Sequence, residues 1–129
     1  MRAIVDTHAL LWWIGGEQGR LSRAQVDFLR DPANELLWSV MSTVEIGALV
    51  AKQKLELDRP LMDWCRHWIQ RLGMGLLPVE HDHALRCAQL DRHHGDPIDR
   101  ILVAQALALD AVIVSRDRAL RRYPARFIV

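Results

Sequence analysis

The sequence predicts an α/β fold of three layers, in which helices cover both faces of a short, mostly parallel central sheet. Short apolar runs alternate with helical patterns along all 129 residues. Parallel strands need long crossover connections, and the helical segments between the runs supply them. Half of the residues are hydrophobic, and glycine and proline are sparse, which argues against disorder. We therefore expect one packed domain spanning residues 1–129.

The first elements follow from local sequence patterns. Residues 2–5 (RAIV) form a β-branched run that predicts a strand. The next segment, Thr7 to Ile14, predicts a helix that ends at Gly15-Gly16. Ser22 is suited to cap a second helix, which Asp31-Pro32 stops. These elements together predict a strand–helix unit followed by a further helix.

A second strand and two more helices are predicted in the middle of the chain. Leu36 to Val40 reads as a buried strand. A third helix is expected to open at Ser42 and run through about Lys54. Pro60 opens a fourth helix, in which Trp64 and Trp68 stand one turn apart. This stretch continues the alternation that a parallel sheet requires.

The last part of the chain predicts short strands and helices around one polar loop. In order, these are a strand at 76–79, a helix at 81–90, a loop at 91–95, a helix that begins at Pro97, a strand at 111–114 with a short helix after it, and a strand at 127–129. No internal repeat or interdomain linker is evident.

Charge and cysteine content narrow the class of protein. The formal net charge is +1, which neither requires nor excludes a nucleic-acid partner. A basic edge is predicted near the C-terminus, where arginines surround Asp117 at positions 116, 118, 121, 122 and 126. Two cysteines, Cys65 and Cys87, are too few for a disulfide scaffold and fit a reducing cytoplasm. We expect a cytoplasmic protein without a signal peptide or membrane span, since no apolar run approaches the length of about 20 residues needed.

Four acidic residues lie where predicted strands give way to helices. They are Asp6, Glu45, Asp99 and Asp117. Ligands of an open parallel sheet bind beyond the carboxyl ends of its strands, so these four side chains are expected to converge there. Carboxylate oxygens are the ligands that hard divalent cations prefer. The placement therefore predicts a metal-binding acidic cluster.

Helix capping is the alternative explanation for each acid. Ser42-x-x-Glu45 matches a capping box, in which Glu45 would bond only to backbone. Asp96 is suited to cap the helix that begins at Pro97, with Asp99 as a first-turn acid. Asp6 and Asp117 are open to similar explanations. Capping does not require several acid-bearing strand ends to converge, however, whereas metal-assisted phosphodiester chemistry does.

The segments that carry these acids resemble the motifs of PIN-domain ribonucleases, and most closely those of the VapC toxins of bacterial toxin–antitoxin pairs. The matching segments are IVDTHALLW, STVEIGALVAKQKL and DPIDRILVAQALALDAVIVSRD. They place Asp6 beside Thr7 in the first motif, Ser42 and Glu45 in the second, Asp99 in the third and Asp117 in the fourth. The third motif is a DPxDR variant, which contains Asp96. In the fourth motif Ser115 replaces a frequent threonine, a mild departure because the hydroxyl is kept.

The resemblance implies a three-layer PIN-like fold and a metal-dependent endoribonuclease. It implies Mg²⁺, with Mn²⁺ able to substitute, held by Asp6, Asp99 and Asp117, and it leaves open both water-mediated binding by Glu45 and ligation by Asp96. Thr7, Ser42, Ser115, Arg116 and Arg118 are the implied supporting or substrate-contacting residues. Water activated by one or two ions would cut RNA, usually transfer or ribosomal RNA, leaving a 5′ phosphate and a 3′ hydroxyl. The implied partners are a small VapB-like antitoxin and a second copy of the toxin, in a homodimer or a toxin–antitoxin hetero-oligomer.

Two other functions remain as alternatives. A PIN-like fold that has lost catalysis would serve as an RNA-binding or protein-binding module. A phosphoryl-transfer enzyme or receiver with Asp6 as acceptor is disfavoured, because no second aspartate follows Asp6, no glycine-rich phosphate loop is present and no lysine is suitably placed.

Tryptophans and histidines carry further open interpretations. Trp12 and Trp13 belong either to the core or interface, or to an RNA-stacking surface. Trp64 and Trp68, with Met62 nearby, either pack in the core or line a groove for an antitoxin segment. His93 and His94 face either substrate or solvent. A zinc site at His81, His83, His93 and His94 is disfavoured, because their spacing is not that of zinc ligands.

Overall fold

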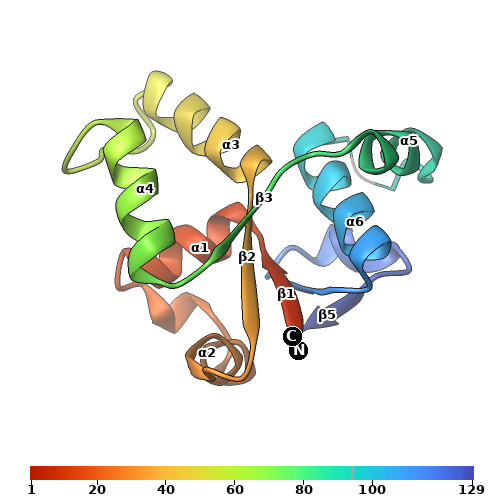
Figure 1. The fold of residues 1–129 in the computed structure, drawn as a ribbon, viewed down its shortest axis with the longest axis horizontal. Coiled ribbons are helices and arrows are strands. Elements are labelled where there is room, and N and C mark those ends of the chain that lie inside the picture. The colour runs from red at the N-terminus through yellow and green to blue at the C-terminus, as the bar shows by residue number, and fades with distance from the viewer. Residues whose placement is uncertain (94) are drawn as a thin grey trace.

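The computed structural model describes residues 1–93 and 95–129, and its central feature is a parallel sheet (Figure 1). The sheet has five strands in the order β3-β2-β1-β4-β5, and each neighbouring pair is parallel. The strands are β1 (Arg2–Val5), β2 (Glu35–Ser39), β3 (Gly75–Leu77), β4 (Val112–Val114) and β5 (Arg126–Ile128). The predicted α/β fold is confirmed. His94, which was considered for substrate contact and for zinc, lies outside the described residues.

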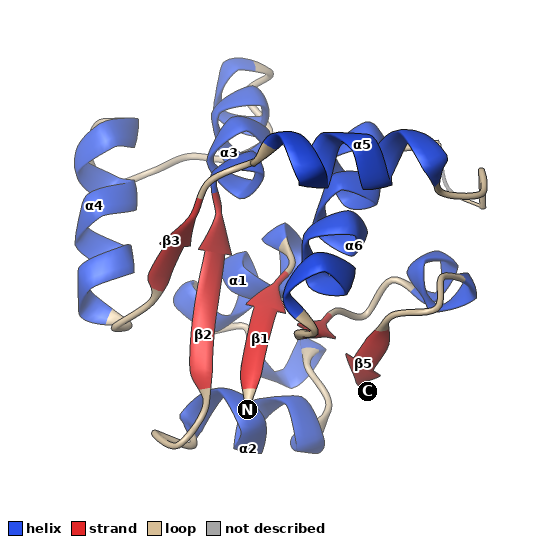
Figure 2. Ribbon diagram, turned by 45° about the vertical axis from the view of Figure 1, so that its right-hand side comes forward, coloured by secondary structure: helices blue, strands red, loops and turns tan. Residues whose placement is uncertain are grey.

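The helices connect the strands and cover the sheet (Figure 2). They are α1 (Thr7–Ile14), α2 (Arg23–Arg30), α3 (Val40–Ala51), α4 (Leu61–Arg71), α5 (His81–Gln89) and α6 (Pro97–Leu109), with short 3₁₀ helices η1 (Gln18–Arg20) and η2 (Arg118–Arg122). Each helix in the described residues is too short or too polar to cross a membrane.

Alternating strand residues build a separate core on each face of the sheet. Ala3 and Val5 of β1 pack with residues of α1, α2, α3 and α4, whereas Ile4 packs with residues of α6. The same alternation places Trp38 in the first core and Leu37 in the second. Side chains of successive strand residues point to opposite faces, so this short apolar sheet needs helices on both sides. The three-layer architecture follows from that requirement.

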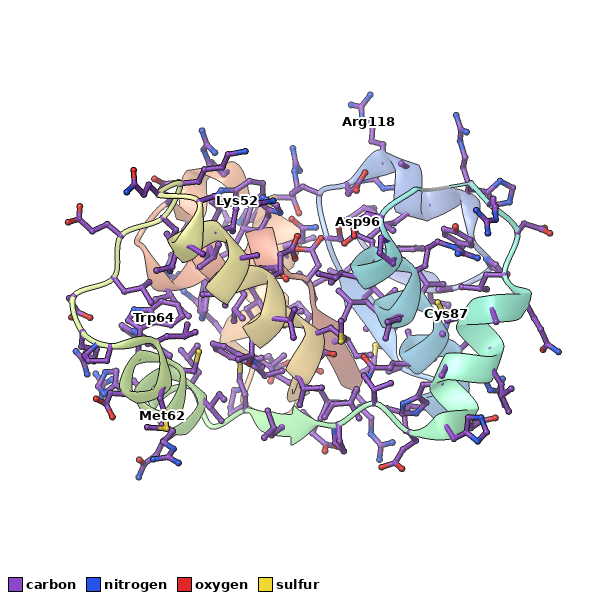
Figure 3. The ribbon with its side chains drawn as sticks, turned by 90° about the horizontal axis from the view of Figure 1, so that it is seen from above. Lys52, Met62, Trp64, Cys87, Asp96 and Arg118 are labelled. Carbon is purple, nitrogen blue, oxygen red and sulfur yellow. The ribbon has the colours of Figure 1, made fainter. Side chains whose placement is uncertain are left out.

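Trp64 is a core residue of the first face. Its side chain is buried on α4 and meets the ring of Trp38 edge-on, with 6.3 Å between ring centroids. Met62, two residues earlier, is 61% exposed and points outward in Figure 3. Trp13 is half-buried against the same core, and the guanidinium of Arg30 lies 5.8 Å from the centre of its ring. Both Trp64 and Trp13 therefore pack against the first core.

The third helix begins earlier than predicted. Ser39, the last residue of β2, also caps α3 by accepting a hydrogen bond from the backbone amide of Met41 at 3.2 Å. The helix therefore starts at Val40 and not at Ser42, and it ends at Ala51. A strand that passes directly into a helix places the first turns of α3 beside the carboxyl end of the sheet.

Strand register brings distant residues together at the same edge. Val5 of β1 is the register partner of Val114 of β4. The residues that follow these two, Asp6 and Ser115, therefore lie side by side where the strands end. The backbone amide of Asp6 also donates to the carbonyl of Val114, at 3.1 Å. This pairing sets the centre of the site described next.

Candidate active site

An acidic pocket of about 300 Å³ lies beyond the carboxyl ends of β1 and β4. Five carboxylates line it, together with a threonine, a histidine, a tryptophan and an arginine. The lining residues are Asp6, Thr7, His8, Trp12, Glu45, Asp96, Asp99, Arg116 and Asp117. The four acids predicted to converge do so around one pocket, and Asp96 joins them.

Asp6 is the most buried of these acids, with 6% of its surface exposed. It caps α1, because its Oδ1 accepts a hydrogen bond from the backbone amide of Ala9 at 2.9 Å. Its Oδ2 accepts from the hydroxyl of Ser115. Both oxygens are thus fixed by protein donors while the carboxylate still lines the pocket. Capping and a role in the pocket are compatible for this residue.

Burial raises the pKa of Asp6 above its ordinary value, because the charged carboxylate is removed from water. The hydrogen bonds from Ser115 and Ala9 oppose that rise, as does the nearby His8. The charge of Glu45 adds to it. A cation in the pocket would favour the charged form of Asp6 and would offset the cost of burying it.

The Ser115 hydroxyl links two acids of the pocket. It donates to Asp6 and accepts from the backbone amide of Asp117 at 3.0 Å. Asp117 in turn caps η2, with its Oδ1 accepting from the backbone amide of Ala119 at 2.9 Å. The buried serine therefore sets the spacing between the chain after β1 and the chain after β4.

Glu45 extends toward the pocket from the second turn of α3. The capping-box interpretation of Ser42 and Glu45 is wrong, because Ser39 caps the helix and Ser42 lies inside it. The buried Ser42 hydroxyl accepts a hydrogen bond from the Thr7 hydroxyl at 3.0 Å, which joins α3 to α1. The Oε1 atom of Glu45 is buried and has no hydrogen-bond partner among the described residues. A buried carboxylate oxygen without a donor is costly unless another partner, such as a cation, meets it.

Asp96 and Asp99 reach the pocket from the start of α6. Asp96 caps this helix by accepting a hydrogen bond from the backbone amide of Ile98 at 2.9 Å, and Pro97 is the first helical residue. Asp99 lies in the first turn. The predicted cap at Asp96 is confirmed, and the same residue also lines the pocket.

The two arginines that flank Asp117 take different positions. Arg116 lines the acidic pocket. Arg118 does not line it, and Figure 3 shows its side chain extending away from the ribbon. Arg116 lies before η2 and Arg118 is the first residue of η2, so the proximity of both to Asp117 in sequence did not distinguish their positions. Of the pair, only Arg116 is placed to meet a group bound among the acids.

Sequence analysis did not select His8, although it lines the pocket two residues after Asp6. His8 is exposed and lies one helical turn before Trp12, with 6.1 Å between the ring centroids. Trp12 is half-buried, packs against the core and also lines the pocket. Its ring therefore packs against the core and also lines the pocket, while stacking on an RNA base stays a prediction. The signal for His8 was its position in the first turn after the acid, on the face of Trp12.

His83 and His93 lie apart from this pocket. The His93 ring meets the Tyr123 ring at 5.2 Å, and His93 lines a different hollow beside Pro124. His83 is buried, and its Nδ1 accepts a hydrogen bond from the backbone amide of Glu80 at 3.0 Å. His83 therefore has a structural role at the start of α5.

The PIN domain family model matches residues 3–126. The chain belongs to the PIN-domain family. A relative in Mycobacterium tuberculosis, Ribonuclease VapC22, is 28% identical to this PIN domain over 121 residues, which cover 93% of this chain and 90% of the relative. All four predicted acids lie within residues 3–126, the range that the family model matches.

Solved structures share the fold of this PIN domain. A chain of VapBC2 from Rickettsia felis, bound to a DNA fragment from its promoter, aligns with a TM-score of 0.74 and 12% identity, covering 98% of this chain and 97% of that one. A chain of the DNA-bound VapBC from Salmonella typhimurium aligns with a TM-score of 0.69 and 17% identity, covering 98% and 96%. At these identities the likeness establishes the fold.

The donor set of the pocket fits a hard divalent cation. The five carboxylates offer oxygen ligands only, and the pocket contains no cysteine. The unpartnered Oε1 of Glu45 is a buried oxygen in need of a positive partner. Across residues 1–93 and 95–129, however, no three histidine, cysteine, aspartate or glutamate side chains are already gathered as a ligand group. Carboxylates without a cation between them repel one another, which keeps them apart. Cation binding would therefore require these acids to draw closer.

Proposed function

We propose that this PIN domain is a metal-dependent endoribonuclease and the toxin of a VapBC-type toxin–antitoxin pair. The observation that carries the proposal is the convergence of five carboxylates in one pocket at the carboxyl ends of parallel strands. Such a site serves phosphodiester hydrolysis without a serine or cysteine nucleophile. The similarity to Ribonuclease VapC22 supports RNA as the substrate. Transfer or ribosomal RNA is the substrate class we propose.

Asp6, Asp99 and Asp117 are the residues we propose to hold Mg²⁺ or Mn²⁺. Glu45 would bind through water, and Asp96 would contribute from the same pocket. When bound, the cation supplies an activated water for in-line attack on the phosphodiester. The protein prepares for this chemistry by fixing both oxygens of Asp6 and by keeping a buried, unpartnered oxygen on Glu45, a residue that lines the pocket.

Arg116 is the residue that we propose contacts the RNA backbone. It lines the pocket on the same segment as Asp117, so a phosphate held among the acids would lie within reach of its guanidinium. Arginine contacts to phosphate position nucleic acid without selecting a base. Thr7 and Ser42 have a supporting role, because their hydrogen bond holds α1 against α3.

We propose a small VapB-like antitoxin as the protein partner. A hollow of about 410 Å³ between α1, the chain before α4 and α4 itself is lined by Leu11, Trp12, Ile14, Gly15, Glu17, residues 55–58, Trp64 and Trp68. Aromatic and aliphatic walls suit the apolar face of a bound segment. Met62 lies outside this groove, which changes the predicted set. Assembly as a homodimer or as a toxin–antitoxin hetero-oligomer, in the cytoplasm, completes the proposal.

A catalytically inactive RNA-binding or protein-binding module is the second candidate. The observation in its favour is that the described acids form no ready three-ligand group. The two candidates differ in one measurable property, since only the nuclease requires the pocket to bind a divalent cation.

The test is cleavage of total cellular RNA by the purified, antitoxin-free protein in Mg²⁺, Mn²⁺ or chelator. The nuclease proposal predicts discrete fragments with metal, and none from Asp6→Asn or Asp99→Asn. Asp27→Asn is the matched control, because Asp27 is an exposed acid on α2 outside the pocket. Equal cleavage by all variants, or cleavage in chelator, would contradict the proposal.

A further inference from the structure

Gln25 is a fully buried polar residue outside the acidic pocket. It lies on α2, and none of its surface is exposed. Its Oε1 accepts a hydrogen bond from the backbone amide of Ser22 at 3.0 Å, as part of a capping box. Its Nε2 donates to the carbonyls of Ser115 at 2.9 Å and Ile128 at 2.8 Å. Both hydrogens of the side-chain amide are thus in use.

These bonds hold the chain just after β4. Ser115 follows the last residue of β4, and Ile128 ends β5, the neighbouring strand. The buried Ser115 carbonyl and the Ile128 carbonyl both accept from the Gln25 side chain, which lies 90 and 103 positions away in sequence. A buried carbonyl without a donor is costly, so the segment has a strong preference for the position that Gln25 dictates.

The same segment carries two contacts of the acidic pocket. Ser115 offers its carbonyl to Gln25, and its hydroxyl donates to Asp6 while accepting from the Asp117 amide. A continuous series of hydrogen bonds therefore runs from α2, through Ser115, to the carboxylate of Asp6 and the backbone amide of Asp117. A shift of the Ser115 backbone would move its hydroxyl away from both partners at once.

We propose that Gln25 is a positioning residue that sets the spacing of Asp6 and Asp117 for cation binding. This inference rests on the proposed function, because the spacing matters only if the pocket binds a metal. Gln25 acts through Ser115 and touches neither substrate nor cation. Its role is that of an outer partner that orients metal ligands, a role in which substitution typically weakens metal affinity or activity by about 10- to 100-fold.

The test compares three variants of the full chain. Gln25→Met keeps the length of the side chain but removes both donors and the acceptor. Gln25→Glu keeps the acceptor for Ser22 and places oxygen against two carbonyls. Ser22→Ala is the matched control, since it removes the cap that the Ser22 hydroxyl gives to α2 and leaves the side-chain amide of Gln25 in place. For each protein, Mn²⁺ affinity is measured by calorimetry and Tm by thermal unfolding in chelator.

We expect both Gln25 variants to bind Mn²⁺ at least about tenfold more weakly than wild type. Ser22→Ala lowers Tm but binds Mn²⁺ with wild-type affinity. Equal Mn²⁺ affinity in folded Gln25→Met and wild type would overturn the inference, as would an equal loss in Ser22→Ala. Failure of wild type itself to bind Mn²⁺ would remove the proposed function together with this inference, so the two failures are distinguishable.

A measurement on the wild-type protein covers the case in which neither Gln25 variant folds. In a Mg²⁺ titration followed by NMR, the side-chain amide resonances of Gln25 should shift, because the donor to Ser115 senses the rearranged acids. Those of Gln89, exposed at the end of α5, should stay unchanged. Unshifted Gln25 resonances in a protein that binds Mg²⁺ would contradict the role.

Discussion

The hydroxyl of Ser115 donates a hydrogen bond to the carboxylate of Asp6, across 109 positions of sequence. The contact exists because β1 and β4 are neighbours in register and both end at the same edge of the sheet. It joins the first and last acidic segments of the pocket. The pKa of Asp6, and with it the pH range in which Asp6 is charged, should therefore depend on Ser115.

Replacing Ser115 with alanine should weaken nuclease activity and shift its dependence on pH. The lost hydrogen bond lowers the pKa of Asp6 in wild type, so its removal raises that pKa further. Asp6 must be charged to hold a cation, and the variant should consequently lose activity at a higher pH than wild type as the solution is acidified. An activity loss of about 10- to 100-fold at neutral pH is expected for an outer partner of this kind.

Ser115→Thr is the matched variant because it keeps a hydroxyl. Its pH–rate profile should remain close to that of wild type. If Ser115→Ala and wild type lose activity at the same pH, the hydroxyl does not control the ionisation of Asp6.

Asp6→Asn should abolish cleavage and stabilise the metal-free protein. Burial raises the folded-state pKa of Asp6 above the unfolded value. The folded protein therefore binds the proton more tightly, and the free energy of unfolding falls as pH rises from the unfolded pKa to the folded pKa. Above that window the charged carboxylate remains a penalty, which a neutral asparagine removes.

Thermal unfolding in chelator at neutral pH measures this effect. We expect Asp6→Asn to gain about 1 kcal/mol, a common size for stabilising changes. The difference should shrink below the unfolded pKa, where wild type is also neutral. A variant less stable than wild type at neutral pH would show that the hydrogen bonds to charged Asp6 outweigh its burial.

Arg116→Ala should weaken RNA binding by removing one phosphate contact. Binding is measured in an Asp99→Asn background, so that the RNA remains intact. Loss of one contact lowers the salt dependence, reducing the slope of log affinity against log salt by about 1. Arg118→Ala serves as the control, since Arg118 does not line the pocket. An equal effect of both substitutions would indicate that Arg116 makes no special phosphate contact and that the RNA backbone binds elsewhere on the basic edge.

Gln105→Leu should destabilise the fold. Gln105 is fully buried on α6, accepts a hydrogen bond from the Ser39 hydroxyl at 2.7 Å and donates to the Pro78 carbonyl at 3.1 Å. The leucine leaves both groups without their partner, at a cost of about 1–3 kcal/mol per group. Urea unfolding measures the loss, and Gln89→Leu on the exposed face of α5 should change little. Equal stability of the two variants would contradict this account.

Sequence predicted part of the candidate site because two of its acids follow strands, whereas Asp99 lies on a helix that follows α5 and not a strand. Asp6 comes directly after a β-branched run, and Asp117 follows another such run by two residues. In a parallel sheet, strand order and direction place these residues at one edge. The position of Asp96 was also predictable, since Asp-Pro is a helix-start signal.

Local sequence patterns did not predict the features that depend on contacts between distant parts of the chain. Ser42-x-x-Glu45 has the letters of a capping box, but Ser39 starts the helix earlier and Ser42 bonds to Thr7 instead. The bonds that the Gln25 side-chain amide donates to the Ser115 and Ile128 carbonyls could not be predicted, because these partners lie 90 and 103 positions away in sequence. Arg116 and Arg118 both flank Asp117 in sequence, but Arg118 is the first residue of η2 and only Arg116 lines the pocket.

The central claim is that the acidic pocket cuts RNA by hydrolysis, and the chemical nature of the RNA ends tests it most directly. Fragments made in Mn²⁺ would be assayed for adaptor ligation at their 5′ ends with and without prior phosphorylation. Attack by activated water predicts 5′ phosphates and 3′ hydroxyls, ligated without phosphorylation and absent in chelator. Fragments with 5′ hydroxyls and 2′,3′-cyclic phosphates would instead indicate attack by the RNA's own 2′ hydroxyl, and would contradict a hydrolytic role for the acidic pocket.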